Sequence, residues 1–292
     1  MGMEVGIQLD APGEAIARAA ATRAFAEIAR LDGLLSDYRP DSDVRAVAAA
    51  APSAQVVASE VIEVLELAMA VARATGGAFD PTMAPVGALW RAARLSGNLP
   101  SAEEMTAARA LVGWQRVQID RAQSTVRLPV AGMTLDLGGI AKGYILQRAI
   151  TALRAAGARG LITAGGDIVA SEPRRGSQGW AVQIGCAALA DRRGTITRPV
   201  SVALLDREAL ATSGDTAQFV VIDGVRYSHV VDPATGLGLT DHRTVHVRAP
   251  DGTTADAWAT ALSVLGPERS RQVDVPPGVR FCFVDAVDRN PS

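Results

Sequence analysis

The sequence predicts an α+β fold in which helices pack against a mixed, largely antiparallel sheet. Apolar runs of strand length gather in the second half of the chain, and short turn signals at Ile222–Tyr227 and Ala131–Met133 are typical of tight hairpins. Helical patterns stand between and among these runs without regular alternation. This order argues against a doubly wound parallel sheet, in which each strand is followed by a helix.

Helices are expected in five places. Ser101 and Glu104 form a capping box at one start, Ser59 is a candidate cap at another, and Gly76-Gly77 marks a stop. The expected segments are Pro12–Leu31, Ser59–Thr75, a helix beginning at Ser101, a helix that follows Gly139 and ends near Gly157, and Thr253–Gly266.

Strands are expected where apolar, β-branched and aromatic residues form short runs. These runs are Arg116–Asp120, Thr125–Val130, Met133–Leu137, Leu161–Ala164, Trp180–Gly185, Val200–Leu205, Gln218–Asp223, Thr244–Ala249 and Val279–Val287.

The composition allows a large core and gives no electrostatic sign of a polyanionic partner. Of 292 residues, 48% are hydrophobic and 21% charged, which fits a single domain over residues 1–292 or two intimately packed subdomains. The net charge of -2 argues against binding to nucleic acid or to an anionic membrane. No apolar run reaches the roughly 18 residues that a membrane-spanning helix needs.

The two cysteines, Cys186 and Cys282, each lie in an apolar run. Their number and surroundings favour buried free thiols over a disulfide framework or a zinc site.

Lys142 is the only lysine among 29 basic residues. In a chain that otherwise uses arginine, a lysine is expected where a compact, flexible ammonium cannot be replaced by a guanidinium. It falls in the first turn of an expected helix, after Asp136, Gly138 and Gly139. Free N–H groups at a helix start beside an ammonium suit a phosphate or pyrophosphate. The segment has neither the GxGxxG nor the P-loop spacing, and a solvated lysine is the alternative reading.

Asp256 and Thr260 are four residues apart on an expected helix and therefore share one face. A carboxylate and a hydroxyl placed in this way can bind one hard cation such as Mg²⁺. The alternative is local: an aspartate that complements the helix dipole and a threonine that bonds back to a carbonyl.

Two polar segments in the second half also carry candidate chemistry. His229 and Asp232 lie three residues apart in a segment that Pro233 and Gly236 bend into a turn, so an imidazole and a carboxylate can face one site. His242 and His246 are interpreted as structural. The segment Ser213–Asp215 is expected to form a polar turn between two strands, with turn formation as a sufficient explanation.

Together these segments resemble the FAD:protein FMN transferases, also called ApbE-type flavin transferases. The matching motifs occur in order over nearly the whole chain. They are MGM at Met1, Leu35–Val44, Gly76–Trp90, LDLGGIAKG (135–143), TAGGDI (163–168), ATSGD (211–215), HVVDPATG (229–236) and ADAWATALSVLG (255–266). The resemblance implies an α+β fold, bound FAD, and Mg²⁺-dependent transfer of the FMN half of FAD to a threonine or serine of a partner flavoprotein, with AMP leaving.

The resemblance also assigns site residues. It implies metal binding by the carbonyl of Gly139 with Asp256 and Thr260. It implies FAD contacts by Met1, Tyr38, Ala78, Phe79, Asp80, Asp136, Lys142 and the backbone of Val230.

The catalytic expectation is that the partner supplies the attacking hydroxyl. Lys142 and Mg²⁺ then neutralise charge on the pyrophosphate, and His229, oriented by Asp232, accepts the proton.

Three alternatives remain beside transfer to a partner. Water in place of the acceptor hydroxyl would make the protein an FAD pyrophosphatase that yields FMN and AMP. A non-catalytic FAD-binding protein is disfavoured, because storage of FAD needs no metal beside the pyrophosphate. Self-modification at Asp251–Thr254 is disfavoured because Thr254 is expected to cap the following helix.

The chain departs from the family pattern at Ala234 and Gly238, where an arginine and a proline are common. Members are commonly exported lipoproteins, and this sequence shows neither a leader nor a lipobox cysteine. The expectation is a soluble protein, cytoplasmic if the chain is complete and periplasmic or exported if a leader was removed.

Overall fold

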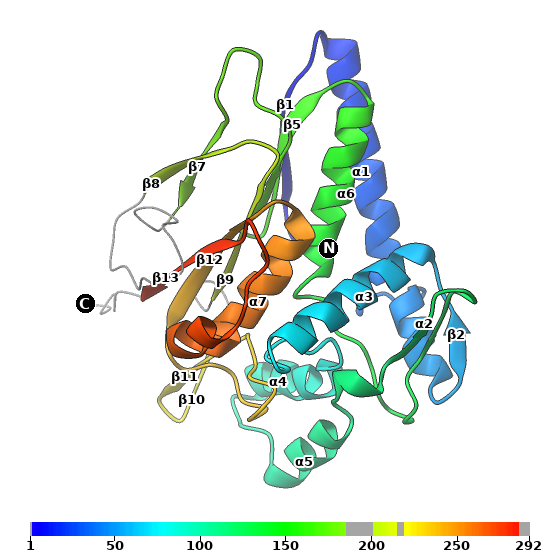
Figure 1. The fold of residues 1–292 in the computed structure, drawn as a ribbon. Helices are drawn as coiled ribbons and strands as arrows, with labels where there is room; N and C mark the ends of the chain where they lie inside the picture. The colour runs from blue at the N-terminus through cyan, green and yellow to red at the C-terminus, as the bar shows by residue number, and fades with distance from the viewer. Residues whose placement is uncertain (1, 185–200, 215–218, 286–292) are drawn as a thin grey trace.

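A six-stranded antiparallel sheet with helices packed on it dominates the computed structural model (Figure 1), which describes residues 2–184, 201–214 and 219–285. The helices are α1 (Glu14–Leu35), α2 (Asp43–Ala50), α3 (Ser59–Ala74), α4 (Ala84–Ser96), α5 (Ala102–Ala110), α6 (Ala141–Ala155) and α7 (Gly252–Arg269), with 3-10 turns at Trp114–Arg116 and Ser270–Gln272. The strands are β1 (Val5–Asp10), β2 (Ala54–Val56), β3 (Gln118–Asp120), β4 (Thr125–Arg127), β5 (Arg159–Ala164), β6 (Asp167–Ala170), β7 (Trp180–Ile184), β8 (Ser201–Leu205), β9 (Ala209–Gly214), β10 (Phe219–Ile222), β11 (Val225–Ser228), β12 (Arg243–Ala249) and β13 (Arg280–Asp285).

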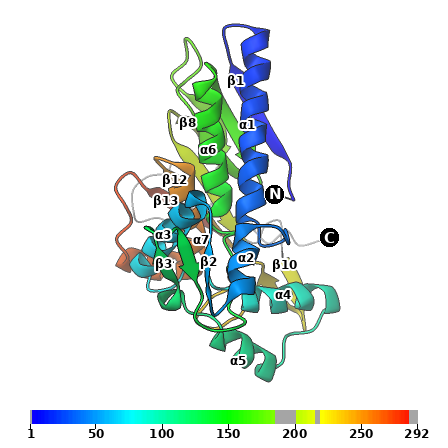
Figure 2. The same ribbon diagram turned by 90° about the vertical axis from the view of Figure 1, so that its right-hand side faces the viewer.

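The main sheet has the order β1-β5-β6-β9-β12-β13, and every neighbouring pair in it is antiparallel. Helix α6 packs on β5 and β6, α7 packs on β9 and β12, and α1 lies along α6. Figure 2 shows α1 and α6 side by side, with α4 and α5 at one end of the molecule. This arrangement confirms the predicted α+β class. Among the described helices, none has the length and apolar content that a membrane span requires.

Local turn chemistry confirms several predicted elements. Ser101 and Glu104 form the capping box of α5. Asp223 and Gly224 both have positive φ between the paired strands β10 and β11, as a two-residue hairpin turn requires. The regular part of α7 ends as expected at Gly266, whose φ of 65° interrupts the helix before Pro267.

Four local predictions were wrong. Ser59 is the first residue of α3 and gives no side-chain cap, because Ala58 occupies the N-cap position. Asp251 caps α7 by accepting from the Thr254 amide, so Thr254 lies inside the first turn. Ser213 and Gly214 end strand β9 of the main sheet and do not form a separate turn; Asp215 lies outside the described residues.

The fourth wrong prediction is the strand Met133–Leu137, which is an irregular segment in the structure. Its residues alternate between buried and half-buried as a strand would, but the Asp136 amide bonds to the Pro81 carbonyl, at 2.8 Å, in place of a ladder. The Ala131–Met133 turn does form, since the Met133 amide donates to the Val130 carbonyl at 3.1 Å.

The thiol prediction is also corrected. Cys282 is buried in β13 as expected, but it is disulfide-bonded and not a free thiol. Cys186 lies outside the described residues.

The starts of α6 and α7 approach each other more closely than any side chain would permit. A methyl group on Gly143 would lie 2.0 Å from the Gly252 carbonyl oxygen and 2.6 Å from Asp256 Cβ. A methyl group on Gly252 would lie 2.5 Å from the Gly143 carbonyl oxygen. Gln147 supports the contact by accepting a hydrogen bond from the Gly252 amide at 3.0 Å. The two glycines therefore fix the distance between the two helix starts.

We predict that Gly143→Ala destabilises the protein by about 2–3 kcal/mol or more, because backbone atoms of α7 must move to accept the methyl group. Gly33→Ala is the matched control. Gly33 is a helical position in α1 with open space beside it, and alanine there should stabilise by about 0.5–1 kcal/mol. Urea denaturation measures the free energy of unfolding of both variants. Small and equal changes in this free energy would show that the contact between α6 and α7 tolerates a side chain.

Candidate functional site

The loop that leads into α6 brings together residues that the sequence separates widely. Asp136 Oδ1 accepts a hydrogen bond from the Gly138 amide at 2.8 Å, which holds the loop in a tight turn. A side chain at Gly139 would come within 2.8 Å of Thr260 Oγ1 and 3.1 Å of Phe79 Cε2. Thr260 Oγ1 lies 3.4 Å from the Gly139 carbonyl oxygen. The loop carbonyl, the α7 hydroxyl and the Phe79 ring thus meet at one point.

Asp256 faces the N-terminus of α6 from the neighbouring helix. Its Oδ2 accepts a hydrogen bond from the Gly143 amide at 2.8 Å, and its Oδ1 lies 3.9 Å from Lys142 Nζ. Lys142 Nζ lies closer, at 2.9 Å, to Oδ2 of Asp167, the first residue of β6. Both carboxylates are nearly inaccessible, with 6% and 3% of their side chains exposed, whereas 18% of Lys142 is exposed.

The charges in this cluster do not balance. Burial, together with the Asp256 charge, raises the pKa of Asp167 to about 8, and burial also raises the pKa of Asp256. Burial lowers the pKa of Lys142, but the charges of Asp256 and Asp167 outweigh this effect and raise it. Two buried acidic side chains thus face one ammonium. When both are ionised, the cluster carries a net negative charge in a poorly solvated space, and a further cation would stabilise that state.

The residues present fit a hard divalent cation. The described residues contain no cluster of three or more His, Cys, Asp and Glu side chains, so a site of imidazoles or thiolates is absent from that part of the chain. The available donors are all oxygens: the Gly139 carbonyl, the Thr260 hydroxyl and the Asp256 carboxylate. Oxygen donors with room for water and phosphate ligands are typical of Mg²⁺.

The Ala78–Asp80 loop is mostly buried and is held by hydrogen bonds to Asp80. Asp80 accepts hydrogen bonds from the Thr82 amide at 2.8 Å, the Thr82 hydroxyl at 2.6 Å and the Trp114 amide at 3.2 Å. Burial raises the pKa of Asp80, and these bonds oppose the rise. The carboxylate thus shapes the loop. A polar pocket of about 330 Å³ lies against it, lined in part by Thr75–Ala78, Arg109, Trp114, Asp232 and Arg269.

Arg91 lies between the surroundings of Tyr38 and Asp136, since a side chain at Gly87 would come within 3.6 Å of Asp136 Oδ2 and 3.8 Å of Arg91. The Tyr38 side chain is 76% exposed, and the Arg91 guanidinium lies 5.5 Å from its ring centre. Arg91 also approaches Asp37 at 3.7 Å. Burial and then the charge of Asp136 raise the pKa of Asp37. An exposed aromatic ring is therefore held beside the loop that leads to Lys142.

The N-terminal segment reaches the same site. Met1 lies outside the described residues. Met3 packs on the β5–β6 turn, where a side chain at Gly165 would come within 2.8 Å of the Met3 sulfur and 3.9 Å of Lys142 Cδ.

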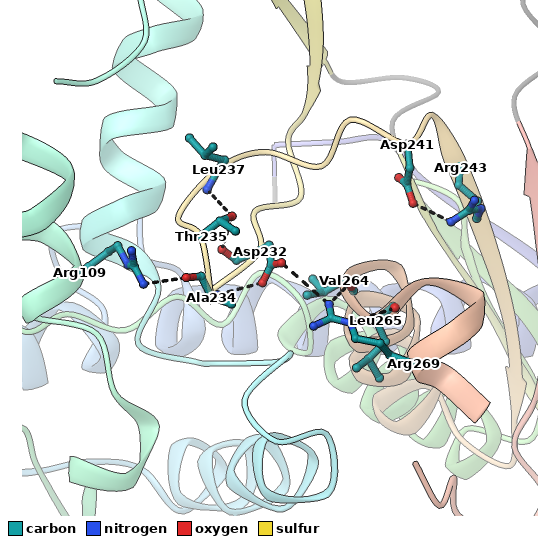
Figure 3. Close-up of polar contacts among 10 residues, drawn as sticks. All are labelled: Arg109, Asp232, Ala234, Thr235, Leu237, Asp241, Arg243, Val264, Leu265 and Arg269. Carbon is teal, nitrogen blue, oxygen red and sulfur yellow. Dashed lines mark hydrogen bonds and ion pairs between the residues drawn. The ribbon is translucent and has the colours of Figure 1, made fainter. Parts of the chain in front are cut away.

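His229 is exposed and directly follows β11, at the edge of the turn Asp232–Gly236. Asp232 holds that turn by accepting from the Ala234 amide at 2.9 Å, and it lies 3.9 Å from Arg269 of α7, as Figure 3 shows. These contacts hold the turn that follows His229. The backbone of Val230 is also engaged, since its amide donates to Ser228 Oγ at 3.0 Å and its carbonyl accepts from Leu239 at 2.9 Å.

The two departures from the family pattern have local partners. Arg109 of α5 donates to the Ala234 carbonyl at 2.7 Å (Figure 3), so a guanidinium from another element reaches this turn. A side chain at Gly238 would come within 2.5 Å of the Ser228 carbonyl oxygen, so the close approach of these two backbone segments requires glycine.

Sequence reasoning brought Lys142, Gly139, Asp256 and Thr260 together correctly in space but did not single out Asp167. The signal was present, because Asp167 lies in the TAGGDI motif directly after two glycines. Nothing in the local sequence shows that this aspartate meets Lys142, since the contact joins β6 to α6.

Comparison with known proteins places the chain among flavin transferases. A family model described as the ApbE family matches residues 1–281. The chain is 34% identical to an FAD:protein FMN transferase of Treponema pallidum over 86% of this chain and 73% of the relative, and 30% identical to one of Klebsiella pneumoniae over 89% and 75%.

Two solved structures are similar over almost the whole chain. The ApbE protein of Thermotoga maritima superposes with a TM-score of 0.81 at 32% identity, covering 96% of this chain and 90% of its own. The flavin transferase ApbE of Vibrio cholerae superposes with a TM-score of 0.84 at 28% identity, covering 99% and 92%.

We predict that, without metal, the folded protein loses stability relative to Asp167→Asn as the pH rises. The pKa of Asp167 is raised from 3.8 to about 8. The contribution of this raised pKa to the free energy of unfolding is therefore fully present below pH 3.8 and is lost as the pH rises through 8. The slope is at most about 1.4 kcal/mol per pH unit.

Urea denaturation in a chelator at several pH values measures this difference. At low pH both side chains are neutral and the two proteins should differ least. A difference that stays constant over the whole range would show that Asp167 ionises in the folded protein as it does in water.

Proposed function

We propose, from the premise that the chain belongs to the ApbE family, that it is an FAD:protein FMN transferase that moves the FMN half of FAD to a threonine or serine hydroxyl of an acceptor flavoprotein. The acceptor oxygen forms a bond to the FMN phosphorus, the bond between the two phosphates of FAD breaks, and AMP leaves. The observation that carries the proposal is the meeting of Gly139, Lys142, Asp256 and Thr260 at two adjoining helix starts.

Each part of the cluster has a proposed task. The Gly139 carbonyl, Asp256 and Thr260 would hold Mg²⁺, which when bound would neutralise charge on the pyrophosphate and orient it. Lys142 would contact a phosphate oxygen as a positive charge close to the partial positive charge of the α6 N-terminus. Tyr38, Asp136 and the Ala78–Asp80 loop would bind the remainder of FAD, together with Met1 and the Val230 backbone.

His229 is the proposed proton acceptor. The exposed position of this side chain fits a base that must meet a hydroxyl delivered by another protein. Asp232, held by the turn and by Arg269, would fix the loop that carries His229.

A second candidate function is FAD hydrolysis to FMN and AMP at the same site. The exposure of His229 favours it, because water can reach the same base when no acceptor protein covers it. The two reactions differ only in the oxygen that attacks the phosphorus, and they are separated by whether FMN ends on protein or in solution.

We predict that incubation with FAD, Mg²⁺ and an acceptor flavoprotein adds one FMN to the acceptor and releases AMP, and that Asp256→Ala abolishes both products. Asp10→Ala is the control, since Asp10 pairs with Arg175 at the far end of β1 and should leave the reaction unchanged. Intact mass of the acceptor and detection of AMP provide the readout. AMP without modified acceptor would support hydrolysis, and bound FAD without either product would contradict both reactions.

We predict that His229→Ala lowers turnover by about 100- to 10,000-fold while FAD binds as before, because a lost general base affects the chemical step alone. His242→Asn is the control, since asparagine tolerates the positive φ of 48° at that position. Single-turnover rates and FAD titration separate the two effects. Weaker FAD binding with an unchanged rate would instead assign His229 to cofactor binding.

A further inference from the structure

We propose that Asp167 is a positioning residue that holds the Lys142 ammonium away from Asp256 and thereby keeps Asp256 available to a divalent cation. This inference rests on the proposed function, because it explains how one cluster can contain both a lysine and a metal-binding carboxylate. It gives a role to a buried side chain that the proposed reaction does not otherwise use.

The position of Asp167 follows from a hairpin turn. Gly165 and Gly166 have φ values of 52° and 91°, and they connect Ala164 and Asp167, which pair across the β5–β6 ladder. Two positive φ values in a two-residue loop are typical of a turn that only glycine-like residues adopt easily. The turn places Asp167 in contact with the Lys142 ammonium, and the aliphatic part of the Lys142 side chain lies beside Gly165.

The Asp167 carboxylate is anchored from the side opposite Lys142. Its Oδ1 accepts a hydrogen bond from the Thr212 amide at 3.2 Å, and Thr212 belongs to the neighbouring strand β9. Thr212 Oγ1 lies 2.9 Å from Nδ1 of His246, its cross-strand partner on β12. Burial lowers the pKa of His246, so this ring is neutral and adds no charge. The anchor is therefore built into three strands of the main sheet.

The remaining oxygen of Asp167 is directed at the cluster. Oδ2 is buried and forms an ion pair with Lys142 Nζ at 2.9 Å. Lys142 Nζ lies 3.9 Å from Asp256, so Asp167 is the nearer of its two partners. Without the Asp167 charge, Coulomb attraction would draw the ammonium onto Asp256, where it would compete with a cation.

The test is a double-mutant cycle in Mg²⁺ binding, which does not depend on turnover. Mg²⁺ is titrated calorimetrically into the wild-type protein, Asp167→Asn, Lys142→Met and the double variant, each saturated with ADP. ADP carries a pyrophosphate and an adenosine but cannot donate FMN. All four proteins are titrated in the same buffer at the same pH. Urea denaturation of each variant shows that it is folded.

The proposal predicts that Asp167→Asn weakens Mg²⁺ binding by about tenfold or more in the wild-type background and leaves it unchanged in the Lys142→Met background. An equal loss in both backgrounds would make Asp167 a direct metal ligand and would overturn the proposal. A loss of stability with unchanged Mg²⁺ affinity would make it a structural residue and would also overturn it. A wild-type protein that binds ADP but no Mg²⁺ would refute the metal site of the proposed function itself.

Discussion

The close contact between Gly143 and Gly252 is the constraint on which the site depends. Because neither position carries a side chain, the first turns of α6 and α7 lie close enough for the Asp256 carboxylate to accept a hydrogen bond from the Gly143 amide. The same approach sets Thr260, one turn further along α7, beside the Gly139 carbonyl. A helix N-terminus carries a partial positive charge, so two such termini at one place favour an anion such as a pyrophosphate.

The electrostatics of the cluster follow from this geometry. Asp167 and Asp256 are buried on two different elements, and in the described part of the chain Lys142 is the basic residue that pairs with both. Such an arrangement costs stability in the absence of a further cation, and function gives the reason for keeping it. The main sheet supports the arrangement because β6, β9 and β12 hold the Asp167 side of the cluster in place.

Much of this architecture could be predicted from local pattern. Capping at Ser101, the hairpin at Asp223-Gly224 and the i, i+4 pair Asp256 and Thr260 depend only on nearby residues. Two failures depended on distant partners. Met133–Leu137 alternates like a strand, but no described strand pairs with it. Asp167 meets Lys142 through tertiary packing. The cap of α7 was missed for a local reason, because Asp251 and Thr254 can both cap and the pattern does not show which of them lies outside the helix.

The most direct test of the central claim is a crystal structure with FAD and Mn²⁺, with the metal located by its anomalous signal. We expect one metal position in direct contact with the Gly139 carbonyl, Asp256 and Thr260 and bridged to the pyrophosphate. We also expect the Lys142 ammonium on a phosphate oxygen, with the aliphatic part of its side chain still beside Gly165. A metal bound elsewhere, or a pyrophosphate away from the starts of α6 and α7, would contradict that claim.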